Sequence, residues 1–206
     1  MSDGRRLRVA LTFDAEHPDR SWCPPGNIEH ILDTLSEADV RATFFVQGRW
    51  AESQPETAHR IADDGHLVGH HSHYHARMPL LSDDGIRSDV LDAQAIITRI
   101  TGRDPRPWFR CPFGAGADDQ RVLGLLEELG YRNVHWDVEL QDWESWRSGP
   151  AIAEDAVAGV MGHGDGAIVL LHTWPGGTGE GIGRIVRELQ EGGATFVPID
   201  ELEAWP

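Results

Sequence analysis

Ala167-Ile168-Val169-Leu170-Leu171-His172 is the stretch that decides the fold of this 206-residue chain. Its five consecutive apolar residues are typical of a strand that is buried on both faces, as the strands of parallel sheets are. We expect a helix on each side of it, near 150–161 and near 180–191. A buried strand between two helices predicts one unit of a repeating β/α fold.

The same alternation of strands and helices extends over the rest of the chain. Further strands are expected at about 7–13, 42–46, 66–70, 107–110, 131–137 and 195–197. Further helices are expected at about 27–38, 50–64, 83–100 and 118–129, with a short one at the C-terminus. About seven β/α units favour an α/β fold with a closed or nearly closed barrel of parallel strands. With no linker, repeat or low-complexity run, 1–206 is expected to be a single catalytic domain.

The charge of the chain limits its partners. The formal net charge is −16, which makes nucleic acid, anionic membranes and polyanionic substrates poor partners and favours a neutral or locally cationic substrate. All 18 basic residues are arginine, which excludes Schiff-base lysine chemistry and a phosphate-loop lysine. The oligomeric state is not readable from the sequence.

Cellular location is expected to be cytoplasmic. The apolar stretch at 7–13 is too short for a signal sequence or a membrane span. Cys23 and Cys111 cannot form a disulfide framework and suit a reducing compartment. Cys111, beside Arg110, is either a thiol of lowered pKa or a small buried filler.

Polar clusters follow five of the predicted strands, at the ends where barrel enzymes place their chemistry. They contain Asp14 and Glu16, His71 and His75, Arg110, Glu139 and Asp142, and His172. Aromatic residues lie beside several of them, namely Trp143, Trp146 and Trp174, and suit either sugar rings or ordinary packing.

The first two clusters have the chemistry of a divalent-metal site. Asp14 and Glu16 are two residues apart, so their side chains share a face if the chain stays extended, although such a pair also suits a loop or a helix cap. His71 and His75 have the four-residue spacing of zinc ligands. His70 and His73 fit a three-residue spacing, so spacing alone does not name the ligands.

The remaining clusters suit acid–base chemistry. Arg110 could hold a catalytic carboxylate in place, and a backbone N–H in the following Pro112–Gly114 turn could face an oxyanion, although a surface ion pair explains the same pattern. A buried Asp142 bonded to His172 would keep that imidazole protonated as an acid. A capping aspartate and a core histidine are the alternative reading.

Taken together, these motifs resemble those of the polysaccharide deacetylases, carbohydrate esterase family 4, from about Leu7 to about Leu202. The most specific are His71-Ser72-x-x-His75 and the strand ending in Leu170-Leu171-His172, joined by Ala42-Thr43-Phe44-Phe45-Val46-Gln47-Gly48. The resemblance implies a distorted (β/α) barrel. It also implies hydrolysis of N- or O-acetyl groups on a carbohydrate or other small acetylated substrate, using one divalent ion, with zinc expected and cobalt or nickel as alternatives.

The resemblance also implies roles for individual residues. His71 and His75 would be metal ligands, Asp14 the general base held by Arg110, and His172 the general acid tuned by Asp142. The backbone N–H of Phe113 would serve the oxyanion. Leu170 would form part of the wall of the pocket for the acetyl methyl group, and Trp143 and Trp174 are expected near this pocket.

One position departs from the family pattern. Members commonly have two adjacent aspartates in the first motif, whereas Ala15 follows Asp14 here, so Glu16 is the expected substitute ligand. Two other functions stay open. One is hydrolysis of a cyclic amide or ureide on the same fold, with or without a metal, and the other is a catalytically silent glycan-binding domain.

Overall fold

The computed structural model describes residues 7–18 and 23–202, and these fall into two compact units. Unit 1 contains the described residues up to Phe13, Pro18, those from 23 to 43, and those from Trp136 onward. Unit 2 contains Asp14–His17 and Phe44–His135. Strand β1 (Leu7–Ala15) contributes its first residues to unit 1 and its last two to unit 2. The expectation of a single domain over 1–206 stays a prediction.

Unit 1 is built on strands β1, β6 (Val138–Glu139), β7 (Ala167–His172) and β8 (Ala194–Phe196), in the order β8-β1-β7-β6. The pairs β1–β8 and β6–β7 are parallel, with Leu7 opposite Ala194 and Val138 opposite Val169. Strand β7 is the apolar run predicted from the sequence, and its first five residues are buried.

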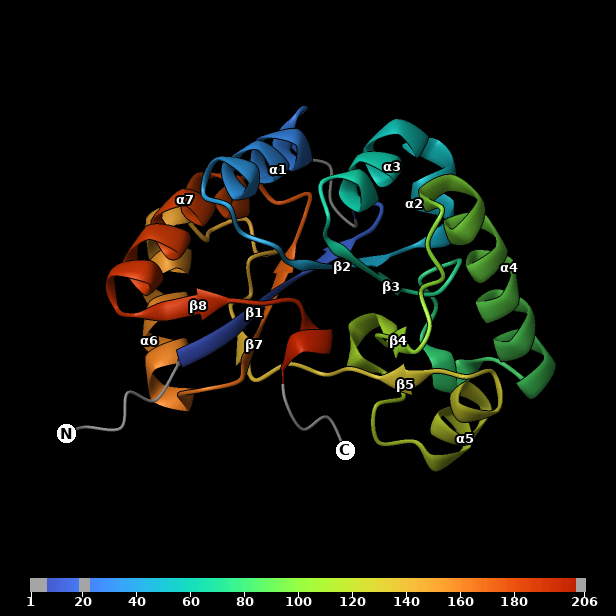
Figure 1. The fold of residues 1–206 in the computed structure, drawn as a ribbon. Helices are drawn as coiled ribbons and strands as arrows, with labels where there is room; N and C mark the ends of the chain where they lie inside the picture. Colours follow the sequence, from blue (N-terminus) through green and yellow to red (C-terminus); the bar gives the residue numbers. More distant parts are fainter. Residues whose placement is uncertain (1–6, 19–22, 203–206) are drawn as a thin grey trace. The chain divides into compact units, whose positions relative to one another are not determined.

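Three helices complete unit 1: α1 (Asn27–Glu37), α6 (Gly149–His163) and α7 (Gly176–Glu191), with a short 3-10 turn, η3 (Ile199–Glu201). Helices α1 and α7 pack on each other, as do α6 and α7 (Figure 1). The buried residues recur at helical spacing, with Ile31, Leu32 and Leu35 on α1. Burial of this apolar stripe is what stabilises an amphipathic helix in a protein.

Unit 2 contains strands β2 (Thr43–Val46, of which Thr43 is grouped with unit 1), β3 (Leu67–His70), β4 (Trp108–Phe109) and β5 (Arg132–Asn133), in that order. The pairs β3–β4 and β4–β5 are parallel. Its helices are α2 (Gly48–Ser53), α3 (Pro55–Asp63), α4 (Asp83–Thr101) and α5 (Gln120–Glu128), with 3-10 turns η1 (Met78–Leu80) and η2 (Pro112–Gly114).

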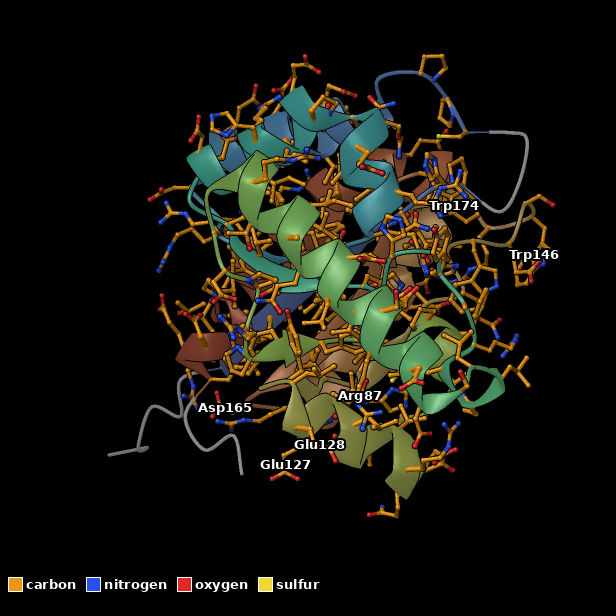
Figure 2. The ribbon with its side chains drawn as sticks, turned by 90° about the vertical axis from the view of Figure 1, so that its right-hand side faces the viewer. Arg87, Glu127, Glu128, Trp146, Asp165 and Trp174 are labelled. Carbon is orange, nitrogen blue, oxygen red and sulfur yellow. The ribbon has the colours of Figure 1, made fainter. Side chains whose placement is uncertain are left out.

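Helix α4 is the longest element of unit 2, and its ends are set by the local sequence. The side chain of Ser82 accepts a hydrogen bond from the Gly85 N–H at 3.1 Å, and Gly102 adopts the left-handed conformation that ends many helices. The inner face of α4 joins a buried cluster with Phe109, Leu126 and Tyr131. An ion pair of 2.9 Å between Arg87 and Glu128 connects α4 to α5 (Figure 2).

Two predicted elements differ from the structure. The helix expected at 50–64 is divided into α2 and α3, because Pro55 has no N–H to continue the first helix and instead begins the second. The strand expected at 131–137 is limited to Arg132–Asn133, and a separate strand, Val138–Glu139, follows it. No helix in the described part of the chain has the length and apolar character needed to cross a membrane.

Candidate active site

Three predicted metal ligands meet at one point in unit 2. Glu16 follows β1, while His71 and His75 follow β3. One oxygen of Glu16, Oε2, lies 3.2 Å from His71 Nε2 and 2.5 Å from His75 Nε2. The three donor atoms all lie within 4.8 Å of one another, and within the described ranges this is the one cluster of three such donors. Glu16 therefore reaches the histidines despite Ala15.

This cluster fits a divalent ion. The Nδ1–H of His71 donates to the Arg110 carbonyl at 2.9 Å, which leaves the lone pair of Nε2 directed at Glu16. That Nε2 is buried and, among the described residues, has no partner with hydrogen-bond geometry. Two imidazoles and a carboxylate are a common ligand set for catalytic zinc. Burial lowers the pKa of His71, but the carboxylates of Asp14 and Glu16 outweigh this and raise it overall.

The loop that carries the histidines is held by its own backbone and by α4. Ser72 and His75 adopt positive φ angles, 62° and 56°, and the hydroxyl of Ser72 accepts the His75 N–H at 2.9 Å. The carboxylate of Asp89, on α4, accepts the N–H groups of His73 and Tyr74 at 2.9 and 3.0 Å. These hydrogen bonds thus anchor the segment that runs from Ser72 to the second proposed ligand, His75.

His70 and His73, which competed as ligands on spacing, do not join the cluster. The Nε2–H of His70 donates to the Val90 carbonyl at 2.9 Å, and its Nδ1 accepts the Ser72 N–H at 3.0 Å. Burial lowers the pKa of His70 to about 3, so it is a neutral core residue. His73 is also buried, and its ring packs against that of Tyr74.

Asp14 lies beside the same histidines and is held by Arg110. The Arg110 Nη1 donates to Asp14 Oδ1 at 2.9 Å, and Asp14 Oδ2 lies 3.5 Å from His71 Nε2. The Arg110 side chain is completely buried, with its guanidinium over the ring of Phe45 at 4.1 Å. Burial lowers the pKa of Arg110, whereas the charge of Asp14 raises it. A cation fixed in this way holds one carboxylate oxygen and leaves the other for chemistry.

Phe113 forms an exposed edge of this cluster. It lies in η2 with a φ of 58°, and its ring centroid is 4.4 Å from that of His75. None of the described residues accepts a hydrogen bond from its backbone N–H. Cys111, two residues earlier, is buried, and burial raises the pKa of its thiol to about 12. Cys111 therefore packs in the core as a small apolar side chain and is not a reactive thiol.

A second cluster lies in unit 1, at the end of β7. Asp142 Oδ1 accepts the Nδ1–H of His172 at 2.8 Å. Asp142 Oδ2 accepts the backbone N–H of the same histidine at 2.7 Å and the hydroxyl of Thr178 at 2.6 Å. The Asp142 side chain is wholly buried. Its carboxylate therefore fixes both the tautomer and the orientation of the imidazole.

Aromatic and apolar side chains surround His172. The ring of Trp143 lies 5.3 Å from the imidazole and that of Trp174 lies 6.1 Å from it, centroid to centroid. Leu170 is buried two residues earlier on β7. Trp146 instead points outward, with 67% of its surface exposed, as its label at the margin of Figure 2 shows. Glu139, which the sequence analysis grouped with Asp142, is exposed and accepts the Trp136 indole N–H at 3.3 Å.

Sequence reasoning missed two residues that support these clusters. Asp89 occupies a buried position on the apolar face of α4, one residue before Val90 and three after Ile86. A charged residue on an apolar stripe was the signal that could have found it. Thr178, near the start of α7, carries no comparable signal.

Comparison with known proteins relates the chain to one family. Residues 2–134 match the family described as polysaccharide deacetylase. The chain is 31% identical over 202 residues to a peptidoglycan-N-acetylglucosamine deacetylase of Bacillus cereus, which covers 96% of this chain and 68% of that protein. It is also 31% identical over 203 residues to a peptidoglycan-N-acetylmuramic acid deacetylase of Bacillus subtilis, with 98% and 73% covered.

The fold is shared with solved structures. A carbohydrate esterase family 4 pseudoenzyme from Bacillus anthracis matches with a TM-score of 0.84 and 28% identity, over 96% of this chain and 66% of that one. This likeness confirms the predicted fold class, an α/β distorted barrel with about seven parallel strands. Because one such neighbour is described as a pseudoenzyme, the fold by itself does not establish catalysis.

Proposed function

The chain belongs to the polysaccharide deacetylase family, and from that premise we propose that it is a metal-dependent hydrolase that removes acetyl groups from an acetylated carbohydrate or amino sugar. The observation that carries the proposal is the meeting of Glu16, His71 and His75 beside a carboxylate, Asp14, that is held by a buried arginine. Relatives with deacetylase names support the same substrate class.

A divalent ion, which we propose to be zinc, would be held by Glu16, His71 and His75, and when bound it would polarise the acetyl carbonyl and make water more acidic. Asp14 takes a proton from the attacking water. Arg110 orients Asp14 through the bond to Oδ1, so that the carboxylate oxygen nearer to His71 is the one available to the water.

Attack of the water oxygen on the carbonyl carbon gives a tetrahedral oxyanion. The backbone N–H of Phe113 has no acceptor among the described residues, which supports its role as a donor to that oxyanion. Collapse of the intermediate breaks the carbon–nitrogen bond, or the carbon–oxygen bond of an ester. The products are acetate and a free amine or alcohol.

The leaving group needs a proton, and we assign this step to His172 of unit 1. Asp142 accepts the Nδ1–H of this imidazole, which leaves Nε2 as the atom that carries a transferable proton. The buried carboxylate also stabilises the imidazolium form. Leu170, Trp143 and Trp174, which lie near His172, are assigned to the substrate pocket.

The test is release of acetate from N-acetylglucosamine, its oligomers and acetylated xylan, with and without added zinc or cobalt. Acetate release that a chelator abolishes and zinc restores is the expected result. Asp14→Asn should bind zinc and release no acetate. The control is Asp92→Asn, which changes an exposed aspartate on α4 and should behave as the wild type.

Other outcomes would favour the alternatives. An active Asp14→Asn variant would contradict the assignment of the base. Opening of a cyclic amide or ureide that survives chelation would replace the proposal with the metal-independent hydrolase. Measurable binding of glycans without acetate release from any substrate would instead indicate a catalytically silent binding domain.

A further inference from the structure

An exposed arginine, Arg77, packs on the same phenyl ring, that of Phe113, as the proposed metal ligand His75. The guanidinium carbon of Arg77 is 4.4 Å from the centroid of the Phe113 ring, and that ring lies 4.4 Å from the imidazole of His75. Both Arg77 and Phe113 are exposed to solvent. The cation is therefore held at the edge of the candidate site, because a guanidinium over an aromatic face is attracted to it.

Among the described residues, Arg77 has no carboxylate partner. The protein carries 34 acidic residues, and most of the described arginines form ion pairs with them. No described carboxylate lies within 4.0 Å of the Arg77 guanidinium, and none of its N–H groups donates to a described residue. Its planar set of donors, which matches the two oxygens of a carboxylate or phosphate, is thus open to a ligand.

A second pair of the same kind lies on the same loop. The guanidinium carbon of Arg49 is 5.8 Å from the ring centroid of Tyr74, the residue immediately before His75. Tyr74 is 60% exposed, and within the described ranges Arg49 also has no acidic partner. Two unneutralised cations therefore border the loop of the proposed ligands in a protein whose net charge is strongly negative.

On the premise of the proposed function, we propose that Arg77 is a specificity-determining residue that binds an oxyanion carried by the substrate. The substrate would then be an acetylated sugar with a carboxylate or phosphate group near the acetyl group. This departs from the expectation of a neutral or locally cationic substrate, which rested on the net charge of the whole chain. Solvent ions screen the net charge beyond about 8–10 Å, whereas a direct bidentate contact is hardly screened.

The test compares kcat/KM for three matched substrates. One is a neutral chitin oligosaccharide, the second alternates N-acetylglucosamine with N-acetylmuramic acid and so adds a carboxylate, and the third is a chitin oligosaccharide phosphorylated at C6. The wild type should prefer a charged substrate. Arg77→Gln should lower the ratio of charged to neutral kcat/KM by roughly tenfold or more, the effect of losing one charge-assisted hydrogen bond. Arg77→Lys keeps the charge without the planar donors, so its ratio of charged to neutral kcat/KM should lie between those of the wild type and Arg77→Gln.

Arg103→Gln is the matched control, because Arg103 is an exposed arginine of unit 2 that also lacks an acidic partner in the described chain. It should leave the ratio unchanged. A ratio that falls only for the carboxylate or only for the phosphate identifies the oxyanion. Preference of the wild type for the neutral substrate, or an unchanged ratio in Arg77→Gln, would overturn this inference alone. Absence of acetate from all three substrates would instead overturn the proposed function.

Discussion

Replacement of Asp89 by alanine should loosen the loop that carries His71 and His75. Asp89 is 3% exposed, and the two oxygens of its carboxylate accept the backbone N–H groups of His73 and Tyr74 at 2.9 and 3.0 Å. Hydrogen bonds to charged groups contribute about 1.5–3 kcal/mol each. Tyr74 is exposed, so water can replace its acceptor, whereas the N–H of His73 would stay buried without one.

The expected loss in the free energy of unfolding is therefore about 2–4 kcal/mol. Unfolding in urea, monitored by circular dichroism, should show a lower midpoint concentration of urea and an unchanged dependence of the unfolding free energy on urea concentration. The affinity for zinc, measured by competition with a chelator, should fall by roughly 10- to 100-fold, as it does when a group that orients metal ligands is removed.

Asp92→Ala is the control for this prediction. Asp92 lies on the same helix but is exposed, and its carboxylate accepts only a hydroxyl, that of Ser88 at 3.2 Å, among the bonds described. Its removal should cost about 0.5 kcal/mol or less and leave zinc affinity unchanged. Equal effects of Asp89→Ala and Asp92→Ala would refute the role assigned to the buried carboxylate.

Three further predictions concern other parts of the molecule. Asp142→Asn should reduce kcat for acetate release by about 10²- to 10⁴-fold without loss of bound zinc, because the amide no longer fixes the protonated form of His172; full activity would contradict this. Leu126→Ala should lower the free energy of unfolding in urea by about 2–5 kcal/mol, because Leu126 is completely buried in the core of unit 2. At pH 8, Cys111 should resist alkylation until the protein unfolds, because burial raises its pKa to about 12, while the partly exposed Cys23 should be labelled in the native protein; mass spectrometry distinguishes the two.

Much of the fold could be predicted from local sequence because its signals are local. The apolar run that forms β7 and the Ser82 and Gly102 boundaries of α4 each act within a few residues. The extent of β5 could not be predicted in this way. The alternation from 131 to 137 is that of a strand, but only Arg132 and Asn133 pair with β4, and the neighbouring chain decides where pairing ends.

The polar clusters of the candidate site could be predicted from the sequence, but not every residue that supports them. Parallel strands bring their carboxyl ends to one edge, and this is why Glu16 and the histidine motif were expected together. Spacing alone left His70 and His71 open, and the family resemblance selected His71. The structure gives the physical reason, because β3 ends at His70 and the left-handed turn at Ser72 changes the direction of the side chains that follow. Asp89 was missed because a charged residue on a helix is usually solvated.

Glu16 is the residue on which the account depends most, since Ala15 stands where the family commonly has a ligand. Anomalous diffraction at the zinc absorption edge, on crystals grown with zinc, tests this directly. We predict one zinc ion bound by the side chains of Glu16, His71 and His75, and no ion at that position in Glu16→Ala. A zinc ion bound to the two histidines with Glu16 turned away, or no zinc at this position, would contradict the account.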